Sequence, residues 1–483
     1  MNTKDIIMKL KKDTNNTDVI IIRKKIVSRK VLYIIYIESL TSSDKISDFV
    51  IRSLDKINLN YPRCKNLDDV IYNEIENFKV KEINNYDDIS YHINNGFTVI
   101  LSEESTRMFA LETKNLYLSR SINSPQTESA LRGAMDAFVE NIQTNMGLIR
   151  RRIKDNNLWY ESIEVGRTTK TKVNVVYMNN IVKKELVNRV TSLIKKIDID
   201  GVISSGTIKN LIEKENKSVF PTIFTTERPD KVCQSLLAGR VVIMVDSSQF
   251  ALLLPITMND LFLSTEDGFN KSINITLTRF IRYISFFITL FTPAIYVAVT
   301  TYNQEMLPTE LLVNFASQRA SVPFPAFFEA LIMLVAFELL RESDLRSPTF
   351  TTSALSTVGA LILGEAAVNA GIVSPIMIIV IAITALSSLL FTEPEMINGV
   401  RWWRIIFMLG ASFMGIIGVV LTFAIFIIKI CSVSSFGVPY FMPFSPISTT
   451  GLKNSIVKFS TKKLDKREPQ LSSNTTKLKE VQE

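Results

Sequence analysis

The segment spanning residues 403–428 reads WRIIFMLGASFMGIIGVVLTFAIFII and contains a single charged residue, Arg404. A run of this length and composition is long enough to cross the roughly 30 Å hydrocarbon core of a bilayer as an α-helix. Three other stretches, residues 284–300, 353–373 and 374–391, are also dominated by apolar side chains. The sequence therefore predicts an α-helical, multi-pass transmembrane domain.

The composition of the chain changes near Asn270. The 483 residues are too many for one compact core. Charged residues are frequent before this point and sparse from Arg279 to Lys429. We expect a first α/β cytoplasmic subdomain (residues 1–118), a second α/β cytoplasmic subdomain (119–270), a transmembrane domain with four or five hydrophobic helices (271–446) and a basic, disordered tail (447–483).

The N-terminal half alternates between strand and helix patterns. Runs of β-branched and aromatic residues at 19–22, 31–37 and 97–101 predict strands in the first subdomain. In the second subdomain the spacing predicts a helix over 128–154, followed by a strand over 172–178 and further alternating elements. This alternation is typical of α/β architecture.

The net charge of +8 is distributed along the chain and does not form one basic stripe. It argues against nucleic acid as a partner and fits positive flanks that orient a membrane protein among lipids. The first 16 residues lack the apolar core of a signal peptide, so we expect the N-terminal region to be cytoplasmic. The run Arg150, Arg151 and Arg152 is either a binding surface for acidic subunits or anionic lipids, or a solvated helix end.

No enzyme signature occurs in the sequence, which lacks phosphate-loop, zinc-protease and nucleophile-elbow motifs. The single histidine, His92, cannot build a His-based metal site or a triad by itself. The three cysteines are far apart, which argues against a disulfide framework. We therefore expect no catalytic residues, no metal and no cofactor.

Residues 325–340 are a doubtful fifth span. Sixteen residues rise about 24 Å as a helix, less than the hydrocarbon core. Five spans would also place the lysine-rich tail outside the cell, whereas four return it to the cytoplasm, as the positive-inside rule favours. We therefore expect residues 325–340 to be re-entrant or to lie in the interface.

Polar residues inside these apolar segments are candidates for a pore or gate, because burying them in lipid is costly. Glu365 and Asn369 lie four positions apart and share a helix face, so Glu365 is either part of an ion pathway or a structural or interfacial group. Small residues beside them allow close helix packing. The predicted packing positions are Gly359, Ala360, Gly364, Ala367, Gly371, Ala411, Gly415 and Gly418.

Glu329 and Glu338 are two further candidates for a pore or gate. Glu338 can pair with Arg341 as a neutralised charge near a helix end. Glu329 follows Pro323 and Pro325, and a proline-broken segment at membrane depth is tolerated mainly where it lines protein or a water-filled cavity. Glu329 is therefore the more promising functional residue of the two.

Several motifs occur over about residues 119–446, among them 293–298, PAIYVA, and 435–440, SFGVPY. These motifs resemble those of the GerA family of spore germinant receptor A subunits. Residues 134–137, AMDA, depart from the family pattern of a proline and a basic residue. The cytoplasmic motif residues are Pro125, Gln126, Thr127, Glu128, Arg132, Gly133, Glu227, Arg228, Pro229 and Asp230.

This resemblance implies a subunit of a nutrient receptor in the spore inner membrane that triggers germination. It implies partnership with a permease-like B subunit and a lipoprotein C subunit, and self-association into a ring that forms a nutrient-gated ion channel. Two other functions remain open from the residues themselves. One is an ion-coupled secondary transporter, and the other is a non-conducting, membrane-anchored signalling scaffold.

Overall fold

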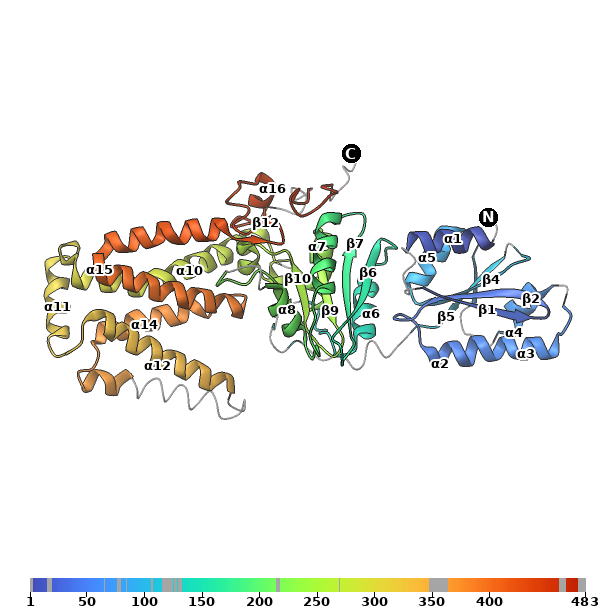
Figure 1. Cartoon of the computed structure of the whole chain (residues 1–483), viewed down its shortest axis with the longest axis horizontal. Helices are drawn as coiled ribbons and strands as arrows, with labels where there is room; N and C mark the ends of the chain where they lie inside the picture. Colours follow the sequence, from blue (N-terminus) through green and yellow to red (C-terminus); the bar gives the residue numbers. More distant parts are fainter. Residues whose placement is uncertain are drawn as a thin grey trace.

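The computed structural model describes the chain in three parts that follow one another along the long axis of the molecule (Figure 1). We call them the first subdomain, the second subdomain and the helical part. The residues outside this description are 1–2, 15–19, 65, 76–79, 84, 106, 115–124, 126–127, 129–132, 214–217, 269, 347–363, 460–465 and 477–483.

The first subdomain is an antiparallel sheet between two layers of helices. Its strands β1 (Ile20–Val27), β2 (Lys30–Ile37), β3 (Val80–Ile83), β4 (Phe97–Ser102) and β5 (Met108–Glu112) lie in the order β1-β2-β4-β5-β3. Central strand β4 is buried along its whole length, because apolar clusters cover both faces of the sheet. Helices α1 (Thr3–Asp13) and α5 (Tyr86–Asn94) cover one face, and α2 (Ser43–Lys45), η1 (Ile46–Ile51), α3 (Arg52–Asn60) and α4 (Leu67–Glu74) cover the other.

The second subdomain repeats this plan. Strands β6 (Leu158–Val165), β7 (Thr171–Met178), β8 (Phe224–Thr226), β9 (Val241–Val245) and β10 (Ala251–Leu254) lie in the order β6-β7-β9-β10-β8. Helices α7 (Lys184–Lys195) and α8 (Ser205–Glu213) pack on one face, and α6 (Ile142–Arg152) and α9 (Pro229–Leu237) pack on the other. The α/β prediction for both subdomains is confirmed by these two sheets.

The helix predicted over residues 128–154 is wrong over the described residues 133–141. Helix α6 begins only at Ile142, because the Asn141 side chain accepts hydrogen bonds from the N–H groups of Gln143 and Thr144 and caps it. The preceding residues 134–139 have no regular structure and lie against the second subdomain, where the Phe138 N–H donates to the Glu227 carbonyl at 2.8 Å.

The helical part contains α10 (Ser272–Thr301), α11 (Thr309–Arg319), α12 (Ala326–Arg346), α14 (Pro375–Ser388) and α15 (Pro394–Ser432). Among the described residues, α10 and α15 are the two helices long and apolar enough to cross a membrane, and α15 consists of two arms that meet at Gly415. Helix α12 has 21 residues, about 31 Å, and packs along α10 and α14. It therefore extends six residues beyond the predicted segment 325–340, and its re-entrant or interfacial placement stays a prediction.

Residues 403–428 do not form one span, contrary to the prediction. The chain reverses at Gly415, whose φ of 60° and ψ of −139° suit glycine, so α15 is a helical hairpin. The two arms lie against each other, with the rings of Trp403 and Phe426 4.9 Å apart. Both ends of α15 therefore lie next to the second subdomain (Figure 1).

The tail expected to be disordered is partly ordered where the structure describes it. Ser455 is 1% exposed and donates to Asn259 Oδ1 at 2.7 Å. Arg279 of α10 donates to the Ser455 carbonyl at 2.8 Å and to Asp267 Oδ2 at 2.7 Å. The tail thus lies at the end of the helical part that faces the second subdomain, because buried polar contacts there hold it.

Candidate functional site

The motif Glu227-Arg228-Pro229-Asp230 fastens the connector between the two subdomains. Pro229 opens α9, and Arg228 just before it is 1% exposed. The Arg228 guanidinium donates to both carboxylate oxygens of Asp230, at 3.1 and 2.8 Å, and to the carbonyls of Glu128 and Ala134. Burial alone would lower the pKa of Arg228, but its bonds to Asp230 raise that pKa above the ordinary value. The motif is therefore a buried clamp.

The other described motif positions are Glu128, Gly133 and Pro125. Glu227 accepts a hydrogen bond from the Glu128 N–H at 3.2 Å, while Gly133 is exposed with a φ of 133°. Pro125 is partly buried. Gln126, Thr127 and Arg132 lie outside the described residues.

A charged junction connects this clamp to the start of α15. Lys231 of α9 pairs with Glu128 at 3.3 Å, and Lys209 of α8 pairs with Glu395 of α15. Glu393, which precedes α15, is 4% exposed. It lies near these four charged groups. Burial raises the pKa of Glu393 to about 8, and Lys231 acts in the opposite direction. Apart from Glu128, no sequence motif marked these residues, because their proximity arises only from the fold.

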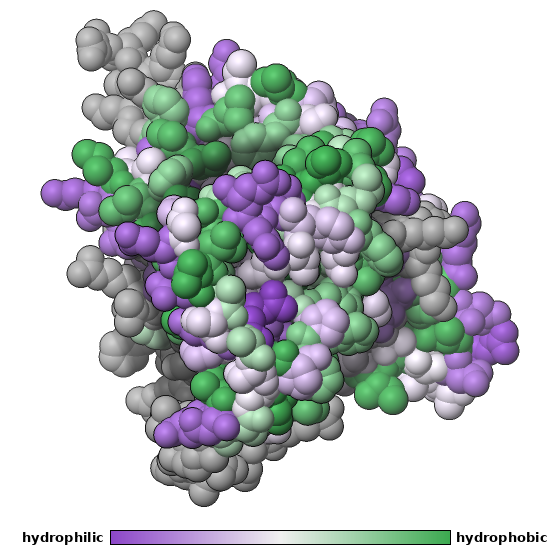
Figure 2. Space-filling view, turned by 90° about the vertical axis from the view of Figure 1, so that its left-hand side faces the viewer, coloured by the Kyte–Doolittle hydropathy of each residue, from purple (hydrophilic) through white to green (hydrophobic). Residues whose placement is uncertain are grey.

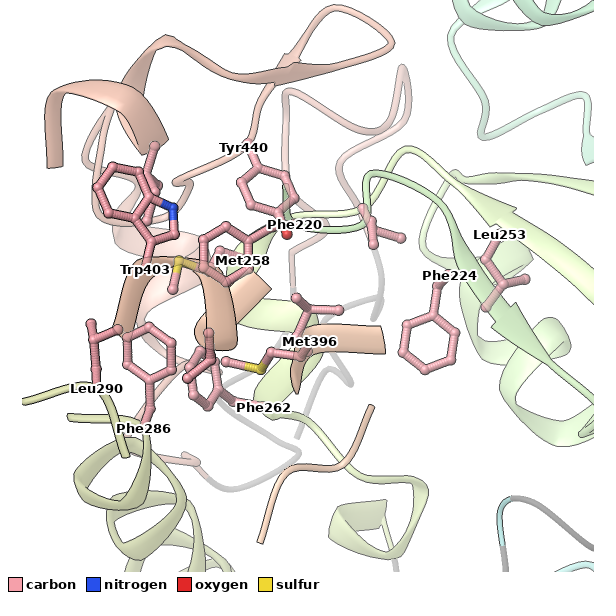
Figure 3. Packing of buried hydrophobic residues seen from close by; sticks show 14 of the residues in the cluster. Phe220, Phe224, Leu253, Met258, Phe262, Phe286, Leu290, Met396, Trp403 and Tyr440 are labelled. Carbon is pink, nitrogen blue, oxygen red and sulfur yellow. The ribbon is translucent and has the colours of Figure 1, made fainter. Parts of the chain in front are cut away.

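An apolar core continues from the second subdomain into the helical part. Phe220 inserts against Gly399 of α15, where an added Cβ would lie 2.5 Å from its ring. The Tyr440 hydroxyl donates to the Pro221 carbonyl at 2.9 Å beside it. Figure 3 shows Phe220, Tyr440 and Trp403 converging with residues of the sheet and of α10. The two parts are therefore joined by packing as well as by the chain.

Glu329 lies inside the helical part and not on its surface. The side chain is 0% exposed, and its Oε1 accepts hydrogen bonds from the backbone and hydroxyl of Ser374, which caps α14. Arg319 Nε lies 3.7 Å from its Oε2, and the Tyr296 hydroxyl lies 3.2 Å from Ser374 Oγ. This cluster ties α10, α11, α12 and α14 together at the end far from the second subdomain.

Glu338 is also held within the chain. Its carboxylate contacts Arg401 at 2.6 Å and Arg404 at 3.7 Å, both on the first arm of α15. The expected pair with Arg341 is present at 3.7 Å. Arg404 is 5% exposed, so Glu338 supplies a counter-charge for a buried arginine.

Glu365 and Asn369 are exposed on the surface of the helical part. The predicted small-residue face beside them packs inward: Gly364 approaches Ile378 of α14, and Gly371, with a φ of 66°, approaches the Ser321 carbonyl. Ala367 is partly buried against the core. Gly359 and Ala360 lie outside the described residues.

The second small-residue stripe builds the α15 hairpin. Ala411 is fully buried, and Gly418 faces the Gly410 carbonyl so closely that a Cβ there would overlap it. Asn303 Oδ1 accepts a hydrogen bond from the Ile416 N–H at 3.0 Å and caps the bend at Gly415. These residues were predicted as helix packing positions, and the bend itself was missed.

The three consecutive arginines of α6 do not form one solvated end. Arg150 is 2% exposed and donates to the Leu158 carbonyl at 3.1 Å, and burial lowers its pKa to about 10. Arg152 holds both carboxylate oxygens of Asp136 at 2.5 and 2.6 Å. Only Arg151 is exposed.

The comparisons with known proteins agree over nearly the whole chain. The family model described as Bacillus/Clostridium GerA spore germination protein matches residues 7–470. Spore germination protein KA of Bacillus subtilis (strain 168) is 44% identical over 339 residues, which are 70% of this chain and 62% of that relative. The chain thus spans less than two thirds of that protein.

Two other matches extend this comparison. Spore germination protein A1 of Bacillus subtilis (strain 168) is 35% identical over 477 residues, covering 97% of this chain and 96% of the relative. The crystal structure of the N-terminal domain of the A subunit of the Bacillus megaterium spore germinant receptor GerK3 aligns with a TM-score of 0.42 and 30% identity, covering 52% of this chain and 94% of that one. The family match and these identities show that the chain belongs to the GerA family of spore germination proteins.

Proposed function

We propose that this chain is the A subunit of a nutrient germinant receptor in the spore inner membrane, where it works with a permease-like B subunit and a lipoprotein C subunit. Copies of the chain associate into a ring, and the ring encloses a nutrient-gated ion pathway. Germinant binding elsewhere in the complex shifts the ring from a closed to an open state.

The outer surface of the helical part supports a membrane location. Large apolar side chains are exposed on each long helix, including Phe287, Val335, Leu386 and Phe413. At the end of the helical part far from the second subdomain, hydrophilic side chains are mixed with hydrophobic ones on the surface (Figure 2). An apolar belt with polar ends is the surface that a bilayer requires.

Glu365 carries the case for a ring. Its side chain is exposed to the surroundings when one chain is considered alone. Glu365 lies about 9 Å along the helix axis from the turn at Gly371. Exposure of this carboxylate to lipid would be costly, so it requires water or a neighbouring subunit. Asn369 lies on the same face. A ring that turns this face inward would place carboxylates along a water-filled pathway, which favours cations.

The positions of Glu329, which is buried, and of Glu338, which is partly buried and paired with arginines of α15, favour a different role for both. Each is engaged by other helices of the same copy, so neither faces a pathway between copies. We assign Glu329 and Glu338 to anchoring the helices whose outer faces form the ring.

Two measurements test this proposal. Native mass spectrometry of the purified full-length protein in detergent should show a closed assembly of three or more copies. Glu365→Gln should lower ion release from nutrient-treated spores at least several-fold, whereas Glu310→Gln, an exposed acid on α11, should leave it unchanged. A monomeric protein, together with normal germination of spores that carry Glu365→Gln, would favour the non-conducting scaffold. The continuous apolar core between the second subdomain and the helices is compatible with such a scaffold.

A further inference from the structure

The C-terminal segment of residues 466–476 forms a small hairpin. Its two ends pair as a β-bridge between Lys466 and Thr476, and the Arg467 N–H donates to the Thr475 carbonyl at 2.7 Å. We call this segment the tail hairpin. It contacts residues as far back in the sequence as Ile181.

The tip of the tail hairpin lies in a groove of the second subdomain. Ser472 is 2% exposed and forms a β-bridge with Val182, and the Ser473 N–H donates to the Ile181 carbonyl at 2.8 Å. Gly239, just after α9, lies against the same two residues, and we call the place formed by residues 181–182 and Gly239 the groove. A Cβ at Gly239 would lie 2.9 Å from both the Leu471 carbonyl and the Ser472 Cβ, so a side chain there would collide with the docked hairpin.

The same hairpin also contacts the loop that follows α15. Leu471 is 6% exposed and packs with Val438 and Met442 in a cluster separate from the main core. Glu468 accepts hydrogen bonds from the hydroxyls of Ser448, at 2.7 Å, and Thr450, at 3.2 Å. One short segment therefore bridges the second subdomain and the exit of the helical part.

We propose that the second subdomain carries a peptide-docking groove, that its occupant is the chain's own tail hairpin, and that the docked hairpin latches this subdomain to the end of α15. The groove offers backbone carbonyls at Ile181 and Val182 and a glycine wall, which suit an extended segment with small side chains. The family match ends at residue 470, so residues 471–473, which fill the groove, lie beyond it.

The docked hairpin can detach at a low free-energy cost. Its apolar contribution is the single side chain of Leu471, and the rest is partly buried hydrogen bonds of Glu468 and Ser473. Segments with few buried apolar contacts open at a low free-energy cost compared with a core. The groove and the loop after α15 would then be held together mainly by the shared core around Phe220. On the proposed function, a released latch makes the receptor easier to open.

Hydrogen exchange on the purified full-length protein tests the docking itself. In the wild type we expect slowed exchange at Ser473, whose N–H donates to the Ile181 carbonyl. Leu471→Asp should remove this protection, whereas Ile447→Asp, the matched change at a side chain that is 78% exposed, should not. Gly239→Val fills the groove without altering the tail and should also remove it. Full-rate exchange at Ser473 in the wild type would overturn the proposal.

A crosslink and a germination assay test the latch. Oxidation of a Val182→Cys, Ser472→Cys, Cys431→Ser variant should join the two strands of the bridge, and spores with the bond should need at least twofold more nutrient than the same spores after reduction. Leu471→Asp spores should need less. An unchanged nutrient requirement in both cases would overturn the latch. Wild-type spores that do not respond to nutrient would instead contradict the proposed function. The docking of the hairpin would still be tested, because the hydrogen-exchange experiment does not depend on germination.

Discussion

At the scale of single residues, Gly415 determines the course of the longest apolar segment. Its φ of 60° and ψ of −139° are outside the regions that other residues adopt, and an added Cβ would overlap Asn303 Oδ1. Asn303, just after the end of α10, stabilises the bend because its Oδ1 accepts a hydrogen bond from the Ile416 N–H. A side chain at Gly415 therefore strains the backbone and also displaces its cap.

We predict that Gly415→Ala destabilises the helical part by about 1–3 kcal/mol, the usual cost of a forced backbone conformation. The melting temperature in detergent should fall, and the Trp402 and Trp403 fluorescence should change with it. Gly206→Ala in α8 is the control, because a Cβ there meets its nearest atom at 3.6 Å. Equal melting temperatures for the two variants would contradict a special role for Gly415.

Arg228 is the second residue whose geometry predicts a measurable effect. Arg228→Lys keeps the charge but loses the planar fork that reaches Asp230 and two carbonyls at once. We predict a loss of about 1–3 kcal/mol, together with faster proteolysis of the connector around residues 128–138. Arg167→Lys tests the same chemistry at an exposed Arg–Asp pair and should change neither.

At the scale of elements, the sequence was informative where runs of β-branched residues mark strands and uninformative where backbone geometry decides. The strands at 31–37 and 97–101 were found because β-branched runs are typical of buried strands. The hairpin of α15 was missed because Gly415 lies among other glycines in an apolar run that also suits one straight helix. The exposure of Glu365 and the burial of Glu329 depend on which helices pack together, and no local pattern encodes that.

The contact between α12 and α15 gives a prediction at this scale. Glu338→Ala leaves Arg404 buried without its carboxylate, and an uncompensated buried charge typically costs about 3–5 kcal/mol. Arg404→Met in the same chain should recover part of that loss, since the charge is then gone. Thermal unfolding of the two single variants and the double variant measures this coupling, and purely additive losses would show that the pair does not interact.

At the scale of the whole molecule, the charged junction makes the attachment of the second subdomain to α15 sensitive to pH. Glu393 is surrounded by Glu128, Glu395, Lys209 and Lys231 from the connector, α15, α8 and α9. Its pKa is raised from 4.5 to about 8, chiefly by burial. The folded protein thus binds a proton that the unfolded chain releases above pH 4.5, so stability falls as pH rises from 4.5 towards 8.

We predict a slope of up to about 1.4 kcal/mol per pH unit in this window, the maximum for one linked proton. Glu393→Gln keeps the shape of the neutral side chain and should abolish the part of the slope that Glu393 causes. Its melting temperature should match that of the wild type at pH 5 and exceed it at pH 8. Glu266→Gln, at a partly exposed acid outside the junction, should follow the wild type at both values. If Glu393→Gln and the wild type instead lose stability in parallel between pH 5 and 8, Glu393 is charged in the folded protein, and the proton-linked junction is wrong.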